Sequence, residues 1–194
     1  SSGTVGNGYY LDQRPAGGNE ASDHFGYALA AGNLNGDGDD ELAVGVPDED
    51  YYAIDEGVVF LFRGNPGRLD SPRVVDQGPA SYAYDVDRFG LALAMGDFNQ
   101  DGRSEVAIGC PHKDDARGHV FIHQERDDSG DDAKVMMELD QAPIASGYFG
   151  DQFGAALAVG DFSGNGTDDL AISAPNKDGT VSDIGKVFIW RYRP

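Results

Sequence analysis

The amino-acid sequence predicts an all-β fold, a β-propeller of four-stranded antiparallel blades, and three observations support this. Short segments rich in alanine, valine, isoleucine and aromatic residues alternate with loops rich in aspartate and glycine, and the 194 residues include 28 glycines. No segment keeps the 3.6-residue apolar period of a helix over the length of a helix. The third observation is an internal repeat, which defines the fold class most directly.

The repeat consists of residue types that recur at a spacing of 64 residues through three copies. Phe25, Phe89 and Phe153, for example, are each followed by glycine. Because several columns keep the same spacing, chance similarity is excluded, and three copies account for nearly the whole chain. The other columns are Asp12-Gln13, Asp76-Gln77 and Asp140-Gln141; Asp23, Asp87 and Asp151; Gly32, Gly96 and Gly160; and Pro47, Pro111 and Pro175.

Each copy contains three apolar runs that read as strands and a weaker fourth. The first run follows Phe-Gly, the second follows an acidic loop, and the third begins at a glycine and is β-branched and aromatic, as strands prefer. We expect first strands at Tyr27–Ala31, Leu91–Met95 and Ala155–Val159, second strands at Glu41–Val46, Glu105–Cys110 and Asp169–Ala174, third strands at Gly57–Phe62, Gly118–His123 and Gly185–Trp190, and fourth strands at Arg73–Asp76, Val135–Asp140 and Tyr9–Asp12.

Four antiparallel strands in each copy form one propeller blade. The alternative for a regular all-β chain is a sandwich, but a sandwich does not need a 64-residue internal copy. We therefore expect a single domain over residues 1–194, with a closing fourth strand within 1–18, blade 1 over 19–82, blade 2 over 83–146, and blade 3 over 147–194 without its own fourth strand.

Three blades are too few to close a propeller ring, because propellers have about four to eight blades. The chain starts with a fourth-type strand and ends with a third-type strand, so the N-terminal strand is expected to complete a last blade. Two arrangements remain open. In the first, a homodimer forms a six-bladed ring in which each N-terminal strand completes the partner's last blade. In the second, the remaining blades belong to a longer propeller.

The charge balance excludes several partners. The chain has 14 basic and 34 acidic residues, which gives a formal net charge of −20. Such a surface repels nucleic acid and anionic membranes, so we expect neither as a partner. No run of about 18 apolar residues is present, so we expect no membrane insertion. The surplus of carboxylates instead suits cations.

Three acidic loops share one pattern, with oxygen-bearing side chains at positions 1, 3, 5 and 9 and glycine at position 6. Alternate side chains can converge on a hard cation, the glycine permits the bend, and the residue at position 7 offers its backbone carbonyl. Ca²⁺ takes six to eight such oxygens. The candidate ligands are Asn33, Asn35, Asp37, Asp39 and Glu41 in the first loop, Asp97, Asn99, Asp101, Arg103 and Glu105 in the second, and Asp161, Ser163, Asn165, Thr167 and Asp169 in the third.

Three other interpretations of these loops fit the sequence less well. An EF-hand needs a glutamate at position 12, where this chain has Val44, Ile108 and Ile172. Turns without metal also favour aspartate, asparagine and glycine, but three such loops in register would hold repelling carboxylates together. Mg²⁺ is the lesser metal alternative because it resists full dehydration by a protein loop. The pattern therefore predicts about three Ca²⁺ per chain.

The order of Phe-Gly, acidic loop and Gly-Xaa-Pro resembles the FG-GAP repeat of integrin α-subunit propellers and their bacterial relatives. The resemblance implies Ca²⁺ held between the first two strands of a blade, on one face of the propeller. It also implies an extracellular module for adhesion or ligand binding. Departures from the family pattern at Asn33, Ser163, Asn165 and Ser173 weaken the first and third copies. The residues that carry the resemblance are Phe25-Gly26 through Gly45-Val46-Pro47, Phe89-Gly90 through Gly109-Cys110-Pro111, and Phe153-Gly154 through Ser173-Ala174-Pro175.

The predicted function is therefore an extracellular calcium-binding propeller module, secreted or at the cell surface, that binds a protein or glycan ligand. The alternative is an enzyme or enzyme-associated propeller domain in which calcium is a structural or catalytic ion. No nucleophile elbow, zinc-protease motif, Walker loop or dinucleotide fingerprint is present, so we expect no catalytic residues. His119 and His123 are expected to be ordinary strand residues, and Cys110 a buried hydrophobe.

Overall fold

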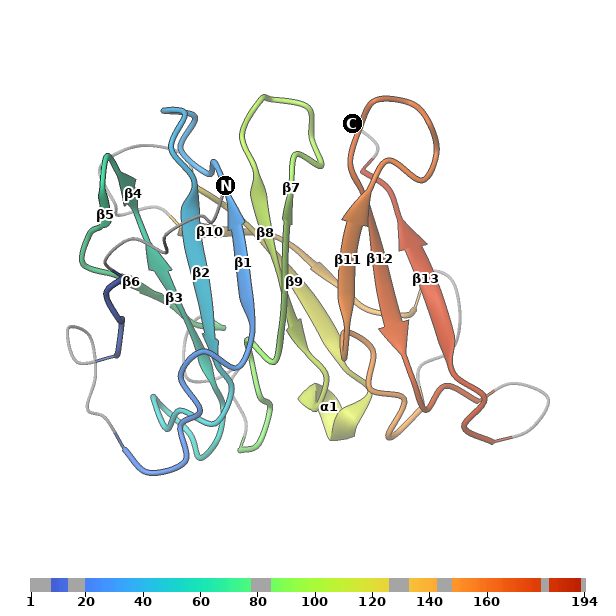
Figure 1. Cartoon of the computed structure of the whole chain (residues 1–194). Coiled ribbons are helices and arrows are strands. Elements are labelled where there is room, and N and C mark those ends of the chain that lie inside the picture. The colour runs from blue at the N-terminus through green and yellow to red at the C-terminus, as the bar shows by residue number, and fades with distance from the viewer. Residues whose placement is uncertain are drawn as a thin grey trace, which may run out of the picture.

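Three antiparallel sheets stand side by side in the computed structural model, which describes residues 8–13, 20–77, 85–125, 133–142, 148–178 and 182–192 (Figure 1). Within these residues the one helical element is α1 (Lys113–Ala116), a single turn in which Asp114 and Asp115 have positive φ. No helix in the described residues is long and apolar enough to cross a membrane. The all-β prediction is confirmed.

The first sheet has the strand order β1 (Leu29–Gly32), β2 (Glu41–Val46), β3 (Val58–Phe62) and β6 (Arg73–Val75). A small hairpin of β4 (Gly64–Asn65) and β5 (Arg68–Leu69) lies between β3 and β6 in the chain. The strand β1 begins later than expected because Gly26 and Tyr27 both donate their backbone N–H to the carbonyl of Gly45 in a turn.

The other two sheets repeat this arrangement. The second contains β7 (Ala92–Gly96), β8 (Glu105–Cys110), β9 (His119–Glu125) and β10 (Ala133–Leu139), in that spatial order. The third contains β11 (Leu157–Gly160), β12 (Asp169–Ala174) and β13 (Lys186–Trp190). The second strands have the expected bounds, and two of the three expected fourth strands are present. The junctions expected at 18/19, 82/83 and 146/147 lie outside the described residues.

Tyr9–Asp12 forms no strand with the described residues of this chain, and its expected pairing with a last blade stays a prediction. This segment instead lies beside the first sheet, at the opposite side of the array from β13 (Figure 1). The Tyr9 hydroxyl accepts a 2.9 Å hydrogen bond from the Leu69 backbone N–H, and Leu11 packs on the apolar cluster that contains Phe60. This segment thus contacts the first sheet through side chains.

The core lies between neighbouring sheets. One buried cluster joins the first and second sheets and includes Leu61 and Phe121, while another joins the second and third and includes Ile122 and Phe188. The second sheet therefore packs apolar side chains on both of its faces, which explains the unbroken apolar runs of its second and third strands.

Close packing of the sheets explains the glycine of Gly-Xaa-Pro. A Cβ atom on Gly45 would overlap the carbonyl oxygen of Gly90, and a Cβ on Gly109 would overlap that of Gly154. The glycine of Gly-Xaa-Pro in one copy thus packs against the carbonyl of the Phe-Gly glycine in the next copy. The third copy has Ser173 at this position, and its hydroxyl accepts a 2.8 Å hydrogen bond from the Ala156 backbone N–H.

Candidate metal-binding loops

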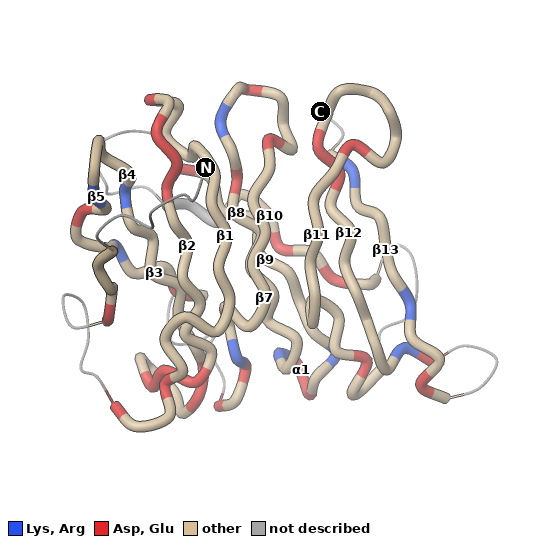
Figure 2. The backbone as a smooth tube through the Cα atoms, viewed as in Figure 1, with Lys and Arg blue, Asp and Glu red and all other residues tan. Residues whose placement is uncertain are grey.

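The three acidic loops lie together at one end of the sheets. They connect β1 to β2, β7 to β8 and β11 to β12, and acidic residues occur in all three (Figure 2). Their common position follows from the repeat, because each loop joins the same two strands of its sheet.

In the first loop a buried glutamate accepts hydrogen bonds from other residues of the loop. Glu41 is 2% exposed and accepts hydrogen bonds from the backbone N–H of Leu34 at 2.8 Å and from the Asn35 amide at 3.3 Å. The same amide donates to Asp37 Oδ2 at 2.8 Å. Positions 3, 5 and 9 are therefore brought together. Asn33 closes the turn by accepting from the backbone N–H of Gly36 at 2.7 Å.

The second loop has the same network. Glu105 is fully buried and accepts from the backbone N–H of Phe98 at 3.0 Å and from the Asn99 amide at 2.7 Å. Asn99 also donates to Asp101 at 3.2 Å. The Asp97 carboxylate accepts hydrogen bonds from the backbone N–H groups of residues 101 and 102, at 3.2 and 3.0 Å. The positions 1, 3, 5 and 9 predicted from the sequence thus lie together.

Position 7 joins the network through its backbone. Asp39 and Arg103 each donate their backbone N–H to the aspartate at position 5, at 2.9 and 3.0 Å, and Thr167 donates to Asn165 at 2.8 Å. These hydrogen bonds are made by the backbone of position 7 and do not involve its side chain. The side chain at position 7 can therefore vary from aspartate to arginine to threonine.

Burial and repulsion from nearby carboxylates disfavour the ionised form of the glutamate at position 9. Burial, together with the nearby charges of Asp101 and Asp97, raises the pKa of Glu105 to about 7, and burial raises the pKa of Glu41. In contrast, backbone N–H groups lower the pKa of Asp37 and of Asp161, which are at the surface. A cation in the loop would favour the ionised form of every one of these groups.

The third loop is organised differently. Asp169 replaces glutamate and has a shorter side chain, and Phe162 donates its backbone N–H to the carbonyl of Gly160 instead. Phe162 is 53% exposed, although the equivalent Leu34 and Phe98 are buried. The structure brings together Asp161, Ser163 and Asn165, since Asp161 accepts from the Ser163 hydroxyl at 3.4 Å and from the backbone N–H of residue 165 at 3.0 Å. Asp169 Oδ2 lies 3.6 Å from the guanidinium of residue 191.

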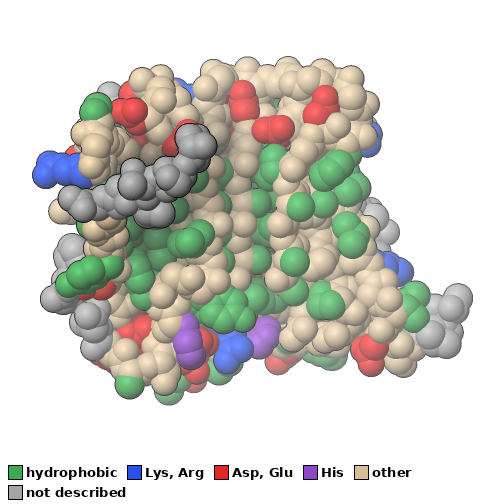
Figure 3. All heavy atoms as spheres, viewed as in Figure 1, with side chains coloured by type: hydrophobic (Ala, Val, Ile, Leu, Met, Phe, Trp, Pro, Cys, Tyr) green, Lys and Arg blue, Asp and Glu red, His purple; other side chains and the backbone are tan. Residues whose placement is uncertain are grey.

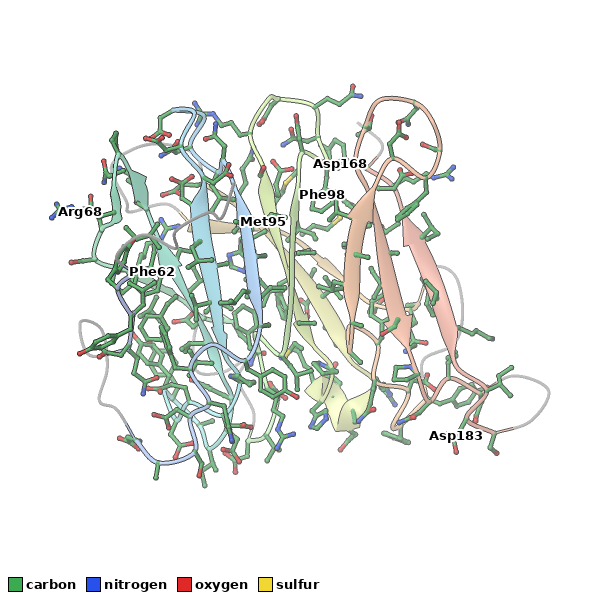
Figure 4. All side chains as sticks on the ribbon, viewed as in Figure 1. Phe62, Arg68, Met95, Phe98, Asp168 and Asp183 are labelled. Atoms are coloured by element: carbon green, nitrogen blue, oxygen red, sulfur yellow. The ribbon has the colours of Figure 1, made fainter. Side chains whose placement is uncertain are left out.

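Contacts between the loops were not apparent from the sequence. The Ser104 backbone N–H donates to the carbonyl of Asn33 at 2.8 Å, and that of Asp97 donates to Oδ2 of Asp168 at 3.0 Å. Figure 4 shows Asp168 beside Phe98 at this end of the molecule. Ser104 and Asp168 share position 8 of their loops, which sequence reasoning passed over because it sought convergence within one loop.

The donor set fits a hard cation, because all side-chain ligands are carboxylate, amide or hydroxyl oxygens. No three histidine, cysteine, aspartate or glutamate side chains in the described part of the chain are close enough to form a metal site by themselves. Amide, hydroxyl and backbone oxygens of the same loops would have to complete the coordination, as the sequence pattern expects.

The cysteine and the two histidines of the third strand, the remaining candidates for a reactive site, have structural contacts. Cys110 is fully buried, and its thiol donates to the carbonyl of Asp87. His123 is buried between the sheets, whereas His119 lies 2.9 Å from Asp114 and 2.8 Å from Glu138. The two histidines therefore have separate surroundings.

The family model described as "FG-GAP repeat" matches residues 25–62 and 153–190. The chain is 35% identical over 169 residues to integrin alpha-4 of Xenopus laevis, with 86% of this chain and 16% of that protein covered. It is 32% identical over 166 residues to integrin alpha-PS3 of Drosophila melanogaster, with 83% and 14% covered. The chain thus spans about 14–16% of the length of these relatives, both of which are integrin α subunits.

Proposed function

Because this chain carries FG-GAP repeats and is homologous to integrin α subunits over most of its length, we propose that it is a calcium-binding propeller module for adhesion or ligand binding. The observation that carries the proposal is the network in the first two loops. In both, the side-chain amide of an asparagine donates hydrogen bonds to a buried glutamate and to an aspartate.

The proposed ligands are the oxygens at positions 1, 3, 5 and 9, with the backbone carbonyl at position 7. Bound Ca²⁺ would supply a fixed positive charge that offsets the repulsion between carboxylates. The second loop has three carboxylates, Asp97, Asp101 and Glu105, and the other loops have two each. We therefore assign it the highest affinity of about three sites per chain.

The proposed setting is extracellular or at the cell surface, and the proposed partner is a protein or glycan. Loops with two or three carboxylates suit the ~10⁻⁴–10⁻³ M calcium affinities of extracellular modules. The names of the relatives, all integrin α subunits, support adhesion rather than catalysis.

We also propose that each 64-residue copy is one blade of a propeller that further sheets complete. Exposed hydrophobic side chains on the outer sheets support this, and hydrophobic side chains are visible on the face in Figure 3. Leu29 is 61% exposed in the first sheet and Val187 67% exposed in the third. The further sheets come from a longer chain or from a second copy in a six-bladed ring. In either arrangement, a sheet that approaches the third copy as Gly154 approaches Gly109 would meet the Ser173 side chain.

Calcium calorimetry tests the proposed function. Wild-type chain should take up about three Ca²⁺, and Asp101→Ala should lose the tightest uptake. Absence of calcium uptake by the wild type would refute the proposal. Light scattering separates the two closures, since the ring requires a mass of twice 20.6 kDa.

A further inference from the structure

Each copy contains a buried polar group at the end of the sheets opposite the acidic loops. Three repeat columns form it: the glutamine of the Asp-Gln pair that precedes Phe-Gly, the aspartate two residues before Phe-Gly, and the second residue after the Gly-Xaa-Pro proline. In the third copy these are Gln141, Asp151 and Lys177, which are 2%, 1% and 2% exposed. Lys177 Nζ lies 2.8 Å from Asp151 Oδ2, so an ammonium offsets the charge of the buried carboxylate.

The second copy has the same arrangement. Lys113 Nζ donates a hydrogen bond to Gln77 Oε1 at 3.0 Å and lies 3.5 Å from Asp87 Oδ2. Lys113 and Asp87 are both buried. In both copies one positive charge therefore balances one buried negative charge.

The first copy has Glu49 where the other copies have lysine. The backbone is in the same place, because Glu49, Lys113 and Lys177 each accept at 3.1 Å the backbone N–H of the glycine that precedes the third strand. The aspartate is also in the same place, since Asp23 accepts the backbone N–H of residue 20 at 2.7 Å, as Asp151 accepts that of residue 148 at 2.6 Å.

This exchange leaves two buried carboxylates without an ammonium. Glu49 is 8% exposed and Asp23 6%, and the buried side-chain amide of Gln13 hydrogen-bonds to both. Glu49 Oε2 is buried and has no hydrogen-bond partner in the described part of the chain. Because an amide is neutral, it does not compensate the repulsion between the two carboxylates.

The other charged groups that face Glu49 are acidic as well. Burial and the charges of Asp23, Glu20 and Asp50 raise the pKa of Glu49 from 4.5 to about 7, and the hydrogen bond from Gln13 opposes this only in part. Like charges confined to a buried place favour the protonated form of one of them. The first copy therefore favours a neutral Glu49.

Basic and aromatic groups do not relieve this repulsion. His24 Nδ1 and Arg88 Nε lie 2.7 and 3.0 Å from the carboxylate of Asp48 instead. In the third copy the centre of the Tyr148 ring lies 4.9 Å from the lysine ammonium, whereas the equivalent residue in the first copy is Glu20.

Gln13 belongs to the N-terminal segment, residues 8–13, which lies beside the first sheet (Figure 1). Two other contacts attach this segment. Leu11 packs on the apolar cluster that contains Phe60, and the Tyr9 hydroxyl accepts the backbone N–H of Leu69. Gln13 is 2% exposed, so the segment stays in place only while the buried carboxylates accommodate this amide.

We propose that a proton on Glu49 replaces the lysine ammonium in the first copy, and that this proton keeps Gln13 and the N-terminal segment on the first sheet. When the proton is lost, Glu49 and Asp23 repel each other, and the segment leaves so that water can reach both carboxylates. The device is at the opposite end of the sheets from the acidic loops and does not need calcium.

The direction of the pH dependence follows from linkage. The pKa of Glu49 is higher with the segment in place than that of an exposed glutamate, so the stabilisation is complete below about pH 4.5 and is lost as pH rises through 7. A difference of about 2.5 pH units sets an upper limit of about 300-fold on the change in the docking equilibrium.

NMR spectra of a chain with labelled leucine methyl groups test the inference, because the Leu11 methyls lie in the cluster with Phe60. Between pH 5 and 8 the population of the released segment should increase at least about tenfold, within the linkage limit. The increase should be the same with calcium and with chelator, which separates it from binding in the loops.

Two substitutions of Glu49 and one control identify the group that titrates. Glu49→Gln is neutral at every pH, and Glu49→Lys restores the ammonium of the other copies, so both should keep the Leu11 signals of the docked segment from pH 5 to 8. The control, Glu20→Gln, removes a neighbouring charge and keeps Glu49. It should retain the transition and move it to lower pH.

The inference is overturned if the wild-type Leu11 signals do not change between pH 5 and 8, or if the same transition persists in Glu49→Gln. Should Glu49→Lys not fold, Glu49→Gln decides alone. Calcium binding by the loops can fail or succeed without altering either result.

Discussion

The Asp97 backbone N–H donates a 3.0 Å hydrogen bond to Oδ2 of Asp168, so that a residue of the third copy holds the first position of the second loop. The loop that we propose as the tightest calcium site therefore depends on its neighbour. Asp168 itself is not in the ligand pattern, because it occupies position 8 of its own loop.

The first prediction concerns this contact. Asp168→Ala should reduce the calcium affinity of the second loop several-fold, because Asp97 loses a partner that fixes its backbone. Calorimetry measures the change. Asp40→Ala, at the same position of the exposed first loop, is the control and should leave the second loop unaffected. Equal effects of the two substitutions would show that only the negative charge matters.

The second prediction concerns the ranking of the loops. Asp101→Ala should remove the tightest calcium binding, whereas Asp37→Ala and Asp161→Ala should remove weaker events, because affinity rises with the number of charged ligands. Titrations of the three variants under one set of conditions give the ranking. The hypothesis fails if Asp161→Ala abolishes the tightest event.

The third prediction concerns stability. A ligand that binds the folded state alone adds about 2.7 kcal/mol at a hundred times its Kd, which for a chain of this size is about 5–10 °C in Tm. Chelator should therefore lower Tm by about this amount, and calcium should restore it. A thermal melt that does not respond to chelator would count against calcium in the loops.

The fourth prediction concerns pH. Burial, with a smaller effect from Arg73, lowers the pKa of His123 from 6.5 to about 4. Since the folded pKa lies below the unfolded one, the stabilisation is present above about pH 6.5 and is lost as pH falls through 4, by up to about 3 kcal/mol. Neither ring nitrogen has a hydrogen-bond partner within the described residues.

The variant that checks this is His123→Phe, which places at this position the residue type of Phe62 in the first copy. It should raise the free energy of unfolding by about 1–3 kcal/mol at pH 7, because a buried polar group without a partner is removed. It should also flatten the loss between pH 6.5 and 4. Unfolding in urea at several pH values measures both effects, and an unchanged pH profile would contradict the assignment to His123.

The fifth prediction concerns the contact between sheets. Gly45→Ala should destabilise the chain by about 3 kcal/mol or abolish folding, because the new methyl overlaps the Gly90 carbonyl. Gly109→Ala should behave alike. Ser173→Gly serves as the control and should cost no more than about 1 kcal/mol, the entropy of a glycine in a strand. Chemical denaturation compares the three variants.

Much of the fold could be predicted from the sequence, because a repeat supplies the same information three times. The columns at Phe-Gly and Gly-Xaa-Pro located each first and second strand, and the loop pattern located the network around Glu41 and Glu105. These features are local or recur at a fixed spacing, so the assignment of a strand or loop in one copy supports the same assignment in the other copies.

The remaining features depend on contacts that spacing alone does not encode. Tyr9–Asp12 has the composition of a strand, but in this chain the segment packs on the first sheet through its side chains. The third loop has the residue types of the pattern. The shorter Asp169, however, does not accept the backbone N–H of Phe162, whereas Glu41 and Glu105 accept those of Leu34 and Phe98. The lysine column at residues 113 and 177 was visible in the sequence, but its role emerged only from the buried ion pairs.

Ser173 bears on how an array of these repeats can lengthen by duplication. A further copy placed after the third would bring the carbonyl of its Phe-Gly glycine against the Ser173 side chain, as the carbonyl of Gly154 approaches Gly109. Tandem duplication at that junction would therefore give a poorly packed boundary unless residue 173 also changed to glycine. Duplication of the first or second copy within the array meets no such obstacle, because both Gly45 and Gly109 already admit a neighbour. A lineage that grows by copying blades is thus expected to insert them before the third copy.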